Sequence, residues 1–448
     1  MQFFNSKTRK KEEFISNDEC VNIYVCGPTV YDDAHLGHAR SSISFDLLKR
    51  VIRANGKAVK LAKNYTDIDD KLIKKMTESG KSLAEISEFY IKSYENDMKA
   101  LNVLKPDISP RATEYVNQMI SFIEKLLELK YAYKLDDGIY LNTSLDNLYL
   151  SISNKPQDET ISRLENEAAK LNASDFVLWK FDDKYYNASF GTGRPGWHTE
   201  CVCMILDIFP KLHIHCGGAD LLFPHHENEA CQCRLATKNE LADFWLHNGF
   251  VNINNEKMSK SLNNSFFIKD ALKEFNGETL RFYLLSTHYR QDFNYTIDDL
   301  KASKKRLDKI YRLKKRLSLD EINIDLIAPK SELKDKLINA LSDDLNTSKA
   351  LAIIDEWINC VNVIKPNDTI KDEFLAICEL IGVGLLKPND YLQNCDEKFR
   401  IQILDLIEQR KIAKQNKDYA KADNIRDELN KLGVSIQDTP NGVDWEIL

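Results

Sequence analysis

The stretch Asn22-Ile-Tyr-Val-Cys-Gly-Pro-Thr-Val-Tyr-Asp-Asp-Ala-His-Leu-Gly-His-Ala-Arg40 sets the interpretation of the whole chain. Residues 22–25 are rich in β-forming side chains, Gly27-Pro28 interrupts them, and a helical pattern begins near His38. This order of strand, loop and helix puts a helix N-terminus where free backbone N–H groups can bind a phosphate. Because His35 and His38 flank that N-terminus, the stretch predicts a phosphate-binding strand end.

The composition is typical of a globular chain without a membrane helix. The chain has 448 residues, of which 43% are hydrophobic and 29% charged, and a chain of this length forms about three domains. No run of about 18 apolar residues exists, and residues 1–14 are polar and basic, unlike a secretory signal. The net charge of −7 argues against nucleic-acid binding through bulk charge, but not against local basic patches. We expect a cytoplasmic protein with no membrane partner.

The residues after the opening stretch predict a sheet domain. Residues 43–52 carry apolar side chains at helical spacing until Asn55-Gly56, and residues 58–62 are predicted to form the next strand. The strand–helix–strand order predicts an α/β fold with a doubly wound, Rossmann-like parallel sheet, in which ligands bind beyond the carboxyl ends of the strands. Ser82-Leu-Ala-Glu85 predicts a capping box that opens a helix ending near Leu101.

Two prolines are expected to mark helix starts. Pro110 is expected to open a long amphipathic helix, and Pro224 to stand in the first turn of another. The second assignment places His225 and Glu229 on one helical face, because they are four residues apart. Residues 213–215 are expected at the end of a strand.

The chain after Thr296 is predicted to be almost wholly helical. Residues 301–316 carry nine basic residues against one acidic residue, a pattern that usually marks a solvated helix face. A break at residues 416–418 divides a charged helical pair spanning residues 400–432, and a short mixed tail follows from residue 436.

A second motif, Lys257-Met-Ser-Lys-Ser261, carries two lysines on a polar loop. Two such ammonium groups can close over a triphosphate and stabilise the charge that builds between its α- and β-phosphates as pyrophosphate leaves. Alone, the pentapeptide is equally compatible with a solvated loop. Together and in this order, His35-Leu-Gly-His38 and this loop resemble the HIGH and KMSKS signatures of class I aminoacyl-tRNA synthetases.

The ten cysteines are expected to be reduced thiols or metal ligands. One candidate set combines Cys26 and Cys201 with His225 and Glu229, donors that suit tetrahedral zinc. A rival set, which the local C-x-C spacing slightly favours, is a structural four-cysteine site. Its members are Cys201, Cys203, Cys231 and Cys233. A third reading treats the cysteines as inert core residues.

Motifs along nearly the whole chain resemble cysteinyl-tRNA synthetases. In the N-terminal two-thirds these are residues 26–31, 35–38, 66–71, 193–198 with Glu200-Cys201, 223–229 and 257–261. In the remainder they are residues 283–290, 344–350, 419–429, 438–440 and Trp445. The resemblance implies one zinc ion per chain, held by Cys26, Cys201, His225 and Glu229.

The resemblance also implies roles for other residues. His35, His38, Lys257 and Lys260 would be catalytic, and His35, Gly37, His38 and Lys260 would bind ATP, which comes with Mg²⁺. The implied amino-acid pocket residues are Trp197 and Asp220, with Thr29 and Asn64 equally compatible with a structural role. The implied partners are L-cysteine and tRNA(Cys), and we expect a monomer. For the basic run 301–316, the resemblance makes a contact with the tRNA backbone as plausible as a solvated face.

Zinc suits the task of distinguishing cysteine from serine. The two side chains are near-isosteres, and pocket shape alone separates such pairs poorly. Zinc binds a thiolate avidly and lowers the pKa of the thiol, whereas a serine hydroxyl is a much poorer ligand. A selecting site must keep one coordination position open for the substrate. No editing domain is therefore expected, and residues 107–193 are too few for one.

The expected domain organisation has five parts. A catalytic domain is formed by residues 1–106 and 194–265, with a connective insertion at 107–193. A stem-contact helical region at 266–320, a helical bundle at 321–395 and an anticodon-recognition domain at 396–448 follow. Three residues depart from the family pattern: Phe190 for tryptophan, Cys216 for glycine and Asn263 for glycine.

Three other functions remain compatible with parts of the pattern. One is the related ligase that transfers cysteine to an amino sugar, which needs no helical anticodon reader. Another is a non-catalytic tRNA-binding homologue, which would not need the signature histidines and lysines. The third is a zinc hydrolase with Glu227 or Glu229 as the base, which leaves the lysine loop unexplained.

Overall fold

The computed structural model describes residues 1–154, 170–253, 256–257, 266–439 and 442–447. Its centre is a four-stranded sheet in the order β10-β9-β3-β4, and every neighbouring pair in it is parallel. The strands are β3 (Cys20–Val25), β4 (Ala58–Lys63), β9 (Ile214–Gly218) and β10 (Phe244–Asn248). All four carboxyl ends therefore lie at one edge of the sheet, which confirms the predicted α/β class.

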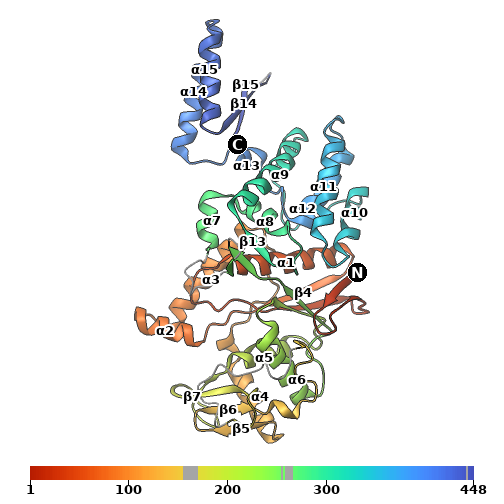
Figure 1. Ribbon diagram of the computed structural model, residues 1–448, viewed down its shortest axis with the longest axis vertical. Coiled ribbons are helices and arrows are strands. Elements are labelled where there is room, and N and C mark those ends of the chain that lie inside the picture. Colours follow the sequence, from red (N-terminus) through yellow and green to blue (C-terminus); the bar gives the residue numbers. More distant parts are fainter. Residues whose placement is uncertain (155–169, 254–255, 258–265, 440–441, 448) are drawn as a thin grey trace.

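The chain between β4 and β9 is long: its first two helices lie beside the central sheet, and its later part forms a second layer of structure below that sheet in Figure 1. Its helices are α2 (Asp70–Ser79), α3 (Leu83–Ala100), η1 (Ala112–Tyr115), α4 (Val116–Glu128), η2 (Thr143–Leu145) and α5 (Trp197–Ile208). Its strands form an antiparallel sheet in the order β5 (Ala132–Leu135), β6 (Gly138–Leu141), β7 (Phe176–Tyr186) and β8 (Gly193–Pro195).

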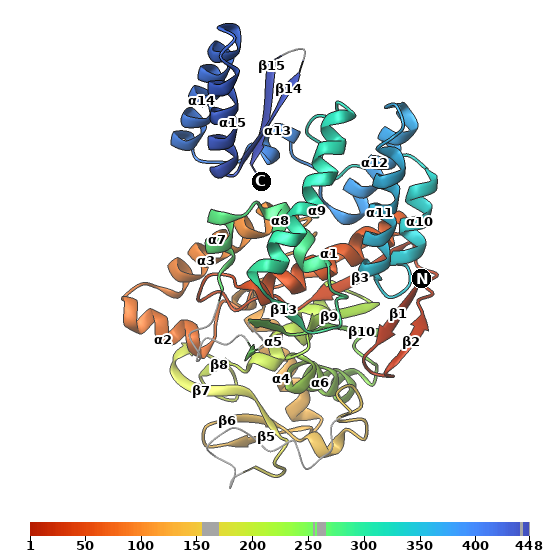
Figure 2. The same cartoon turned by 45° about the horizontal axis from the view of Figure 1, so that its top comes forward.

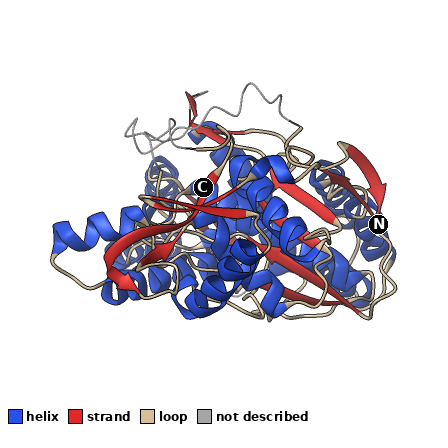
Figure 3. Ribbon diagram, turned by 90° about the horizontal axis from the view of Figure 1, so that it is seen from below, coloured by secondary structure: helices blue, strands red, loops and turns tan. Residues whose placement is uncertain are grey.

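The elements beyond β9 first complete the sheet region. They are η5 (Leu222–His226), α6 (Glu227–Thr237), α7 (Ile268–Glu274), α8 (Gly277–Leu285) and a small sheet of β11 (Val251–Ile253), β12 (Glu256–Lys257) and β13 (Phe293–Tyr295). At the other end of the chain, β1 (Gln2–Asn5) and β2 (Lys10–Glu13) form a hairpin beside β10. Figure 3 shows helices surrounding the red strands of the centre.

The C-terminal third is helical and lies on the opposite side of the central sheet from β5–β8 (Figures 1 and 2). Its helices are α9 (Ile297–Arg316), α10 (Glu332–Leu341), α11 (Thr347–Val361), α12 (Asp368–Ile381), α13 (Pro388–Leu392), α14 (Glu397–Gln415) and α15 (Tyr419–Lys431). A hairpin of β14 (Val434–Thr439) and β15 (Gly442–Ile447) ends it. Among the described helices, none is both long and apolar enough to cross a membrane.

Helix α1 (Leu36–Ala54) joins the sheet to the helical third through a buried ion cluster. Asp46 on α1 accepts hydrogen bonds from Arg50 and from Arg281 of α8, and all three side chains are buried. Arg281 also donates to the carbonyl oxygen of Ile381 at the end of α12, at 2.6 Å. Gly382 is required here, because it has φ +73° and a Cβ would lie 2.7 Å from the Arg281 guanidinium.

Several predicted elements are confirmed. Helix α1 ends before Asn55, β4 begins at Ala58, and Ser82 forms the predicted capping box with Glu85. The break at residues 416–418 separates α14 from α15. The five domain boundaries stay predictions.

Two further local predictions were wrong, at Pro110 and at residues 213–215, and one, at Pro224, was confirmed. The amide of Tyr65 donates to the carbonyl of Pro110, so the chain there is held extended beside β4 and the α-helix begins only at Val116. Phe223 is extended, as residues before proline usually are, and the helical backbone begins at Pro224. This confirms Pro224 in the first turn, and the regular α-helix α6 follows from Glu227. Residues 213–215 lie at the start of β9, since the strand runs to Gly218.

The ion cluster on α1 gives a stability prediction. Asp46→Asn leaves two buried guanidinium groups without their carboxylate, and breaking such a cluster costs about 3–5 kcal/mol. Urea denaturation is expected to show this loss as a lower midpoint. Glu332→Gln, which makes the same chemical change in the exposed pair with Lys336, is expected to leave the midpoint unchanged. Equal midpoints for the two variants would contradict a structural role for Asp46.

Candidate active site

A cavity of about 360 Å³ opens at the carboxyl edge of the central sheet. It is lined by the β3–α1 loop, by the ends of β4, β9 and β10, and by the first residue of α5. The lining includes residues that the sequence pointed to: Cys26, Thr29, His35, Gly37, His38, Trp197 and Asp220. A cavity of this size and position is typical of a small-ligand site in an α/β sheet.

His35 and His38 cap the N-terminus of α1. The Nδ1 atom of His35 accepts the amide of Gly37 at 3.1 Å, and Nδ1 of His38 accepts the amide of His35 at 3.2 Å. The rings stack with their centroids 3.9 Å apart. Because each Nδ1 is an acceptor, a neutral imidazole must carry its proton on Nε2. Both histidines are thereby set to donate a hydrogen bond, next to a helix terminus that favours anions.

A polar cluster holds the first turn of α1 from behind. Ser42 donates to the carbonyl oxygen of His38 at 2.7 Å, and it accepts a hydrogen bond of 2.7 Å from the buried Lys63. Its hydroxyl also lies 2.9 Å from that of Tyr94. Lys63 is the last residue of β4, so this cluster ties the histidine turn to a strand end.

Four potential metal ligands meet at one side of the cavity. Cys26, Cys201, His225 and Glu229 are all buried, and their ligand atoms lie within 4.8 Å of one another. The two sulfur atoms are 3.9 Å apart, which matches the spacing of about 3.8 Å that Zn–S bonds of about 2.3 Å give in a tetrahedron. His225 Nε2 lies 2.7 Å from a Glu229 oxygen. The donor types and the spacing of the sulfur atoms fit zinc.

The charges in this group already favour a cation. A hydrogen bond from the Cys26 thiol, with help from His225, lowers the pKa of the Cys201 thiol to about 6. Burial raises the pKa of Cys26 well above its usual value. Burial also opposes ionisation of Glu229, but His225 and His215 outweigh it and lower the pKa of this carboxyl well below its usual range. Burial disfavours a charge on His225, but Glu229 and Cys201 outweigh burial and raise the pKa of this imidazole to about 10. In the absence of a metal, a proton on His225 therefore balances the thiolate and the carboxylate.

Further histidines surround these ligands. His215 Nε2 lies 2.5 Å from the second oxygen of Glu229, and His226 Nε2 lies 3.3 Å from the Cys26 sulfur. With Cys26 and Glu229 they form a second group, whose ligand atoms also lie within 4.8 Å of one another. Behind it, His226 Nδ1 lies 2.9 Å from His247 Nε2. Burial lowers the pKa of His247 to about 3, so this ring is neutral.

The first group is the one closer to the cavity. Trp197 is 40% exposed, lines the cavity and stacks on His225, with 4.2 Å between ring centroids. Cys26 lines the same cavity. The ligand pair His215 and His226 lies among buried rings on the far side of Glu229. A ligand entering the cavity therefore reaches the Cys26–Cys201–His225–Glu229 group first.

Asn64 lies behind the cavity wall. Its side-chain oxygen accepts the amide of Gly27 at 2.8 Å. A Cβ at Gly27 would lie 1.6 Å from the Asn64 carbonyl oxygen, so only glycine fits there. Asn64 thus positions the residue after Cys26. Asp220 is exposed at the cavity rim, where its carboxylate is available to an amino group.

The lysine loop is only partly described. The backbone of Lys257 belongs to β12, which pairs with β11 just beyond the cavity wall. Lys260 and Asn263 lie outside the described residues.

The extra cysteines do not join a metal-ligand group. Cys203, Cys231 and Cys233 belong to neither of the groups found in the described part of the chain, which gives no support to the four-cysteine site. Burial raises the pKa of Cys203, Cys216 and Cys231 well above the usual value, as expected of inert core thiols. Phe190 packs edge-on against Trp179 in the β5–β8 layer.

Sequence reasoning missed Lys63, Tyr94 and Asn248, which also line the cavity. Lys63 and Asn248 end β4 and β10, so the rule that ligands bind at strand ends could have found them. Tyr94 reaches the cavity from α3, and nothing in the local sequence signals that.

Two family models match the chain. The model described as tRNA synthetases class I (C) catalytic domain matches residues 13–305. The model described as cysteinyl-tRNA ligase anticodon binding domain matches residues 401–445.

Full-length relatives and solved structures agree with these matches. A cysteine–tRNA ligase of Campylobacter lari is 58% identical over all of this chain and 99% of its own length. One of Campylobacter jejuni is 56% identical over the same shares. Mycobacterium tuberculosis methionyl-tRNA synthetase with methionyl-adenylate has a TM-score of 0.59 at 12% identity, covering 83% of this chain and 95% of that one. The Agrobacterium radiobacter LeuRS–tRNA–LeuAMS complex has a TM-score of 0.59 at 11% identity, covering 85% and 86%.

The ligand geometry predicts how the metal content responds to cysteine substitution. The purified chain is expected to contain one zinc ion, and Cys201→Ser to retain less than about a tenth of it, because two thiolates anchor the site. Cys203→Ser, two residues further along α5 and equally buried, is expected to retain all of it. Elemental analysis of the purified proteins measures both. Loss of zinc from both variants would instead favour the four-cysteine site.

Proposed function

The chain belongs to the cysteinyl-tRNA synthetase family of class I aminoacyl-tRNA synthetases, and on this basis we propose how its cavity selects and activates L-cysteine. The chain is an aminoacyl-tRNA ligase. In the proposed reaction, ATP and L-cysteine form cysteinyl-adenylate and pyrophosphate. The cysteinyl group then passes to the 3′-terminal adenosine of tRNA(Cys).

One observation supports this proposal above all. The same cavity of about 360 Å³ borders both a buried two-thiol, imidazole and carboxylate group and the histidine-capped N-terminus of α1. The first suits a thiol-binding metal, and the second suits a phosphate. A molecule that carries a thiol at one end and a phosphate at the other matches this pairing, and cysteinyl-adenylate is such a molecule.

Selection of the substrate side chain is assigned to the zinc ligands. We propose that Cys26, Cys201, His225 and Glu229 hold zinc, which when bound supplies a coordination position that prefers the substrate thiolate to a serine hydroxyl. The stacked indole of Trp197 covers His225 and shapes the entrance. A thiol lying under this ring is shielded from water.

The remaining pocket contacts are assigned to the rim of the cavity. The exposed carboxylate of Asp220 suits the ammonium group of the amino acid. Thr29 lines the cavity between the metal ligands and the histidines. Asn64 does not line the cavity, and we assign it the structural role of holding Gly27.

We assign activation of the amino acid to the part of the cavity that His35 and His38 line. A carboxylate oxygen of cysteine attacks the α-phosphorus of ATP, the bond from this phosphorus to the oxygen bridging to the β-phosphorus breaks, and pyrophosphate leaves. A Mg²⁺ ion bound with ATP would neutralise part of the phosphate charge. The Nε2–H groups of His35 and His38 are placed to donate to the phosphate oxygens as charge builds on them. Gly37 offers backbone without a side chain at the same helix terminus. Lys257 and Lys260 are assigned to the pyrophosphate side.

The transfer step requires tRNA, and helix α9 is the surface considered for contact with the tRNA backbone. Most basic side chains of this helix already hold other parts of the protein: Lys304, Arg306, Arg312, Lys314, Lys315 and Arg316. Lys301, Lys305 and Lys309 are exposed, and no hydrogen bond or ion pair joins them to any residue that the structure describes. Their spacing of four residues puts them on one helix face. We propose this face as a contact for the tRNA backbone.

The match of residues 401–445 to an anticodon-binding domain favours tRNA over an amino sugar as the acceptor. The exposed side chains of Ile401, Leu404 and Tyr419 on α14 and α15 offer surface on which unpaired bases can pack.

Two variants separate activation from transfer. Lys260→Ala is expected to slow cysteine-dependent ATP–pyrophosphate exchange at least tenfold, because one cation facing the leaving group is lost. The triple variant Lys301→Glu, Lys305→Glu, Lys309→Glu is expected to keep exchange unchanged while its kcat/KM for tRNA charging falls at least tenfold. Exchange and charging assays on the same preparations measure both effects.

Lys365→Ala, at an exposed lysine that belongs neither to α9 nor to the lysine loop, serves as the control and is expected to behave like the unmodified protein. Unchanged ATP–pyrophosphate exchange in Lys260→Ala would contradict the role assigned to the lysine loop. Unchanged tRNA charging in the triple variant would mean that Lys301, Lys305 and Lys309 form only a solvated helix face and do not contact tRNA.

A further inference from the structure

A second and larger cavity, of about 1130 Å³, runs along the edge strand β4. Its lining comes from α1, α3, β4, the segment 103–107 and the segment 324–327. Ala58 and Lys63, the first and last residues of β4, both line it, so the cavity follows the strand for about 20 Å. This is room for a ligand the size of a nucleotide.

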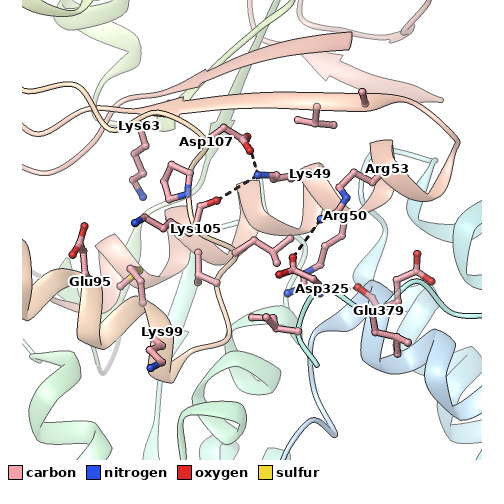
Figure 4. Close-up of a pocket in the computed structure, with 18 of the residues that line it drawn as sticks. Lys49, Arg50, Arg53, Lys63, Glu95, Lys99, Lys105, Asp107, Asp325 and Glu379 are labelled. Carbon is pink, nitrogen blue, oxygen red and sulfur yellow. Dashed lines mark hydrogen bonds and ion pairs between the residues drawn. The ribbon is translucent and has the colours of Figure 1, made fainter. Parts of the chain in front are cut away.

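The two ends of this cavity differ in their charge balance (Figure 4). At one end, Lys49 pairs with Asp107 at 2.9 Å and Arg53 with Asp325 at 3.9 Å. Lys57, at the same end, donates to the carbonyl oxygens of Ser16 and Asp18. At the other end, Lys63, Lys99 and Lys105 face only one carboxylate, that of Glu95 (Figure 4). Within the described residues, neither Lys99 nor Lys105 donates its ammonium to any partner.

Lys63 differs from the other two lysines because its side chain is buried. It is 8% exposed, and a buried ammonium group normally has a carboxylate partner. Lys63 donates one hydrogen bond, to the Ser42 hydroxyl, and lies 5.2 Å from the centre of the Tyr94 ring. An ammonium has three donors, so this contact leaves capacity for an anion.

The walls beside these lysines are partly apolar. Tyr65 and Tyr94 meet edge to face with ring centroids 6.0 Å apart. Met98, Val103 and Pro106 also line the cavity. Tyr65, Tyr94 and Met98 are each more than nine-tenths buried, so a ligand meets only their edges, together with the half-buried Val103 and Pro106. An organic body attached to the anion would cover this apolar strip, which an inorganic anion would leave in contact with water.

From these observations we propose that the cavity along β4 binds a phosphorylated organic anion of nucleotide size. Its phosphate groups lie between Lys63, Lys99 and Lys105, and its organic part lies against Tyr65, Tyr94 and Met98. The site adjoins the catalytic cavity, because Lys63 and Tyr94 line both. The proposal does not depend on the proposed substrate.

The test uses the full-length protein with its catalytic cavity saturated by the sulfamoyl analogue of cysteinyl-adenylate. A fluorescent N-methylanthraniloyl derivative of GDP is then titrated in, and saturable binding of one molecule per chain is expected. The double variant Lys99→Glu, Lys105→Glu is expected to weaken this binding at least tenfold. Both residues are exposed, so the fold is expected to be retained, which circular dichroism checks.

The control variant Lys81→Glu, Lys92→Glu makes the same change of charge at exposed lysines near and on α3 that do not line the cavity. It is expected to bind the probe as the unmodified protein does. Equal losses in the two double variants would mean attraction by overall charge only and would overturn the proposal. So would failure of the probe to bind once the analogue is present.

Competition identifies what the site recognises. Unlabelled GDP is expected to displace the probe, pyrophosphate to displace it more weakly, and guanosine not to displace it. Equal competition by pyrophosphate and GDP would overturn the organic part of the proposal. If the Lys99 and Lys105 variant bound the probe normally but lost tRNA charging, those lysines would belong to an RNA-binding surface and the proposal would fail.

Discussion

The close packing of Gly27 against Asn64 is the contact on which the catalytic half of the molecule depends. Asn64 accepts the Gly27 amide at 2.8 Å, and no side chain fits at Gly27 because a Cβ would lie 1.6 Å from the Asn64 carbonyl. This contact joins the ends of β3 and β4 just where Cys26 leaves the sheet. It thereby fixes how far the thiol of Cys26 lies from the histidine turn that opens α1.

The donors of the metal group are prepared before any ligand arrives. Glu229 is shared by two imidazoles, with one oxygen facing His225 and the other facing His215. The cost of burying this carboxylate is offset by those contacts, and its lowered pKa reflects them. Rigid placement of charged donors is what allows a site to reward a thiolate and penalise a hydroxyl. Helix α1 shows the same compensation of buried charge, because the carboxylate of Asp46 offsets the cost of burying the Arg50 and Arg281 guanidinium groups.

Local signals in the sequence predicted the elements that depend on local chemistry. The spacing of apolar residues predicted α1, and Ser82 and Glu85 predicted the start of α3, because caps and helix faces involve near neighbours. Pro224 likewise marked the start of the helical turn that leads into α6, with the extended Phe223 directly before it. The hairpin β14–β15 stands where a short mixed tail was predicted, although the sequence pair Asn441-Gly442 is a hairpin signal.

For the candidate site, the motifs predicted which residues meet but not what holds them. His35, His38, Cys26 and Trp197 lie around one cavity, as expected from the family resemblance. Lys63, Tyr94 and the array of His215, His226 and His247 come from separate strands and helices, so only the tertiary fold brings them together. Spacing alone could not choose between the mixed donor group and the four cysteines, because ligands from distant loops leave no local pattern.

The central claim is that the substrate sulfur itself becomes a metal ligand beside Cys26 and Cys201. Replacing zinc with cobalt(II) makes this visible, because each thiolate ligand contributes charge-transfer absorption in the near ultraviolet. Adding L-cysteine is expected to raise this absorption by about half, from two thiolates to three, while L-serine leaves the spectrum unchanged. Identical spectra with the two amino acids would contradict thiol selection by the metal.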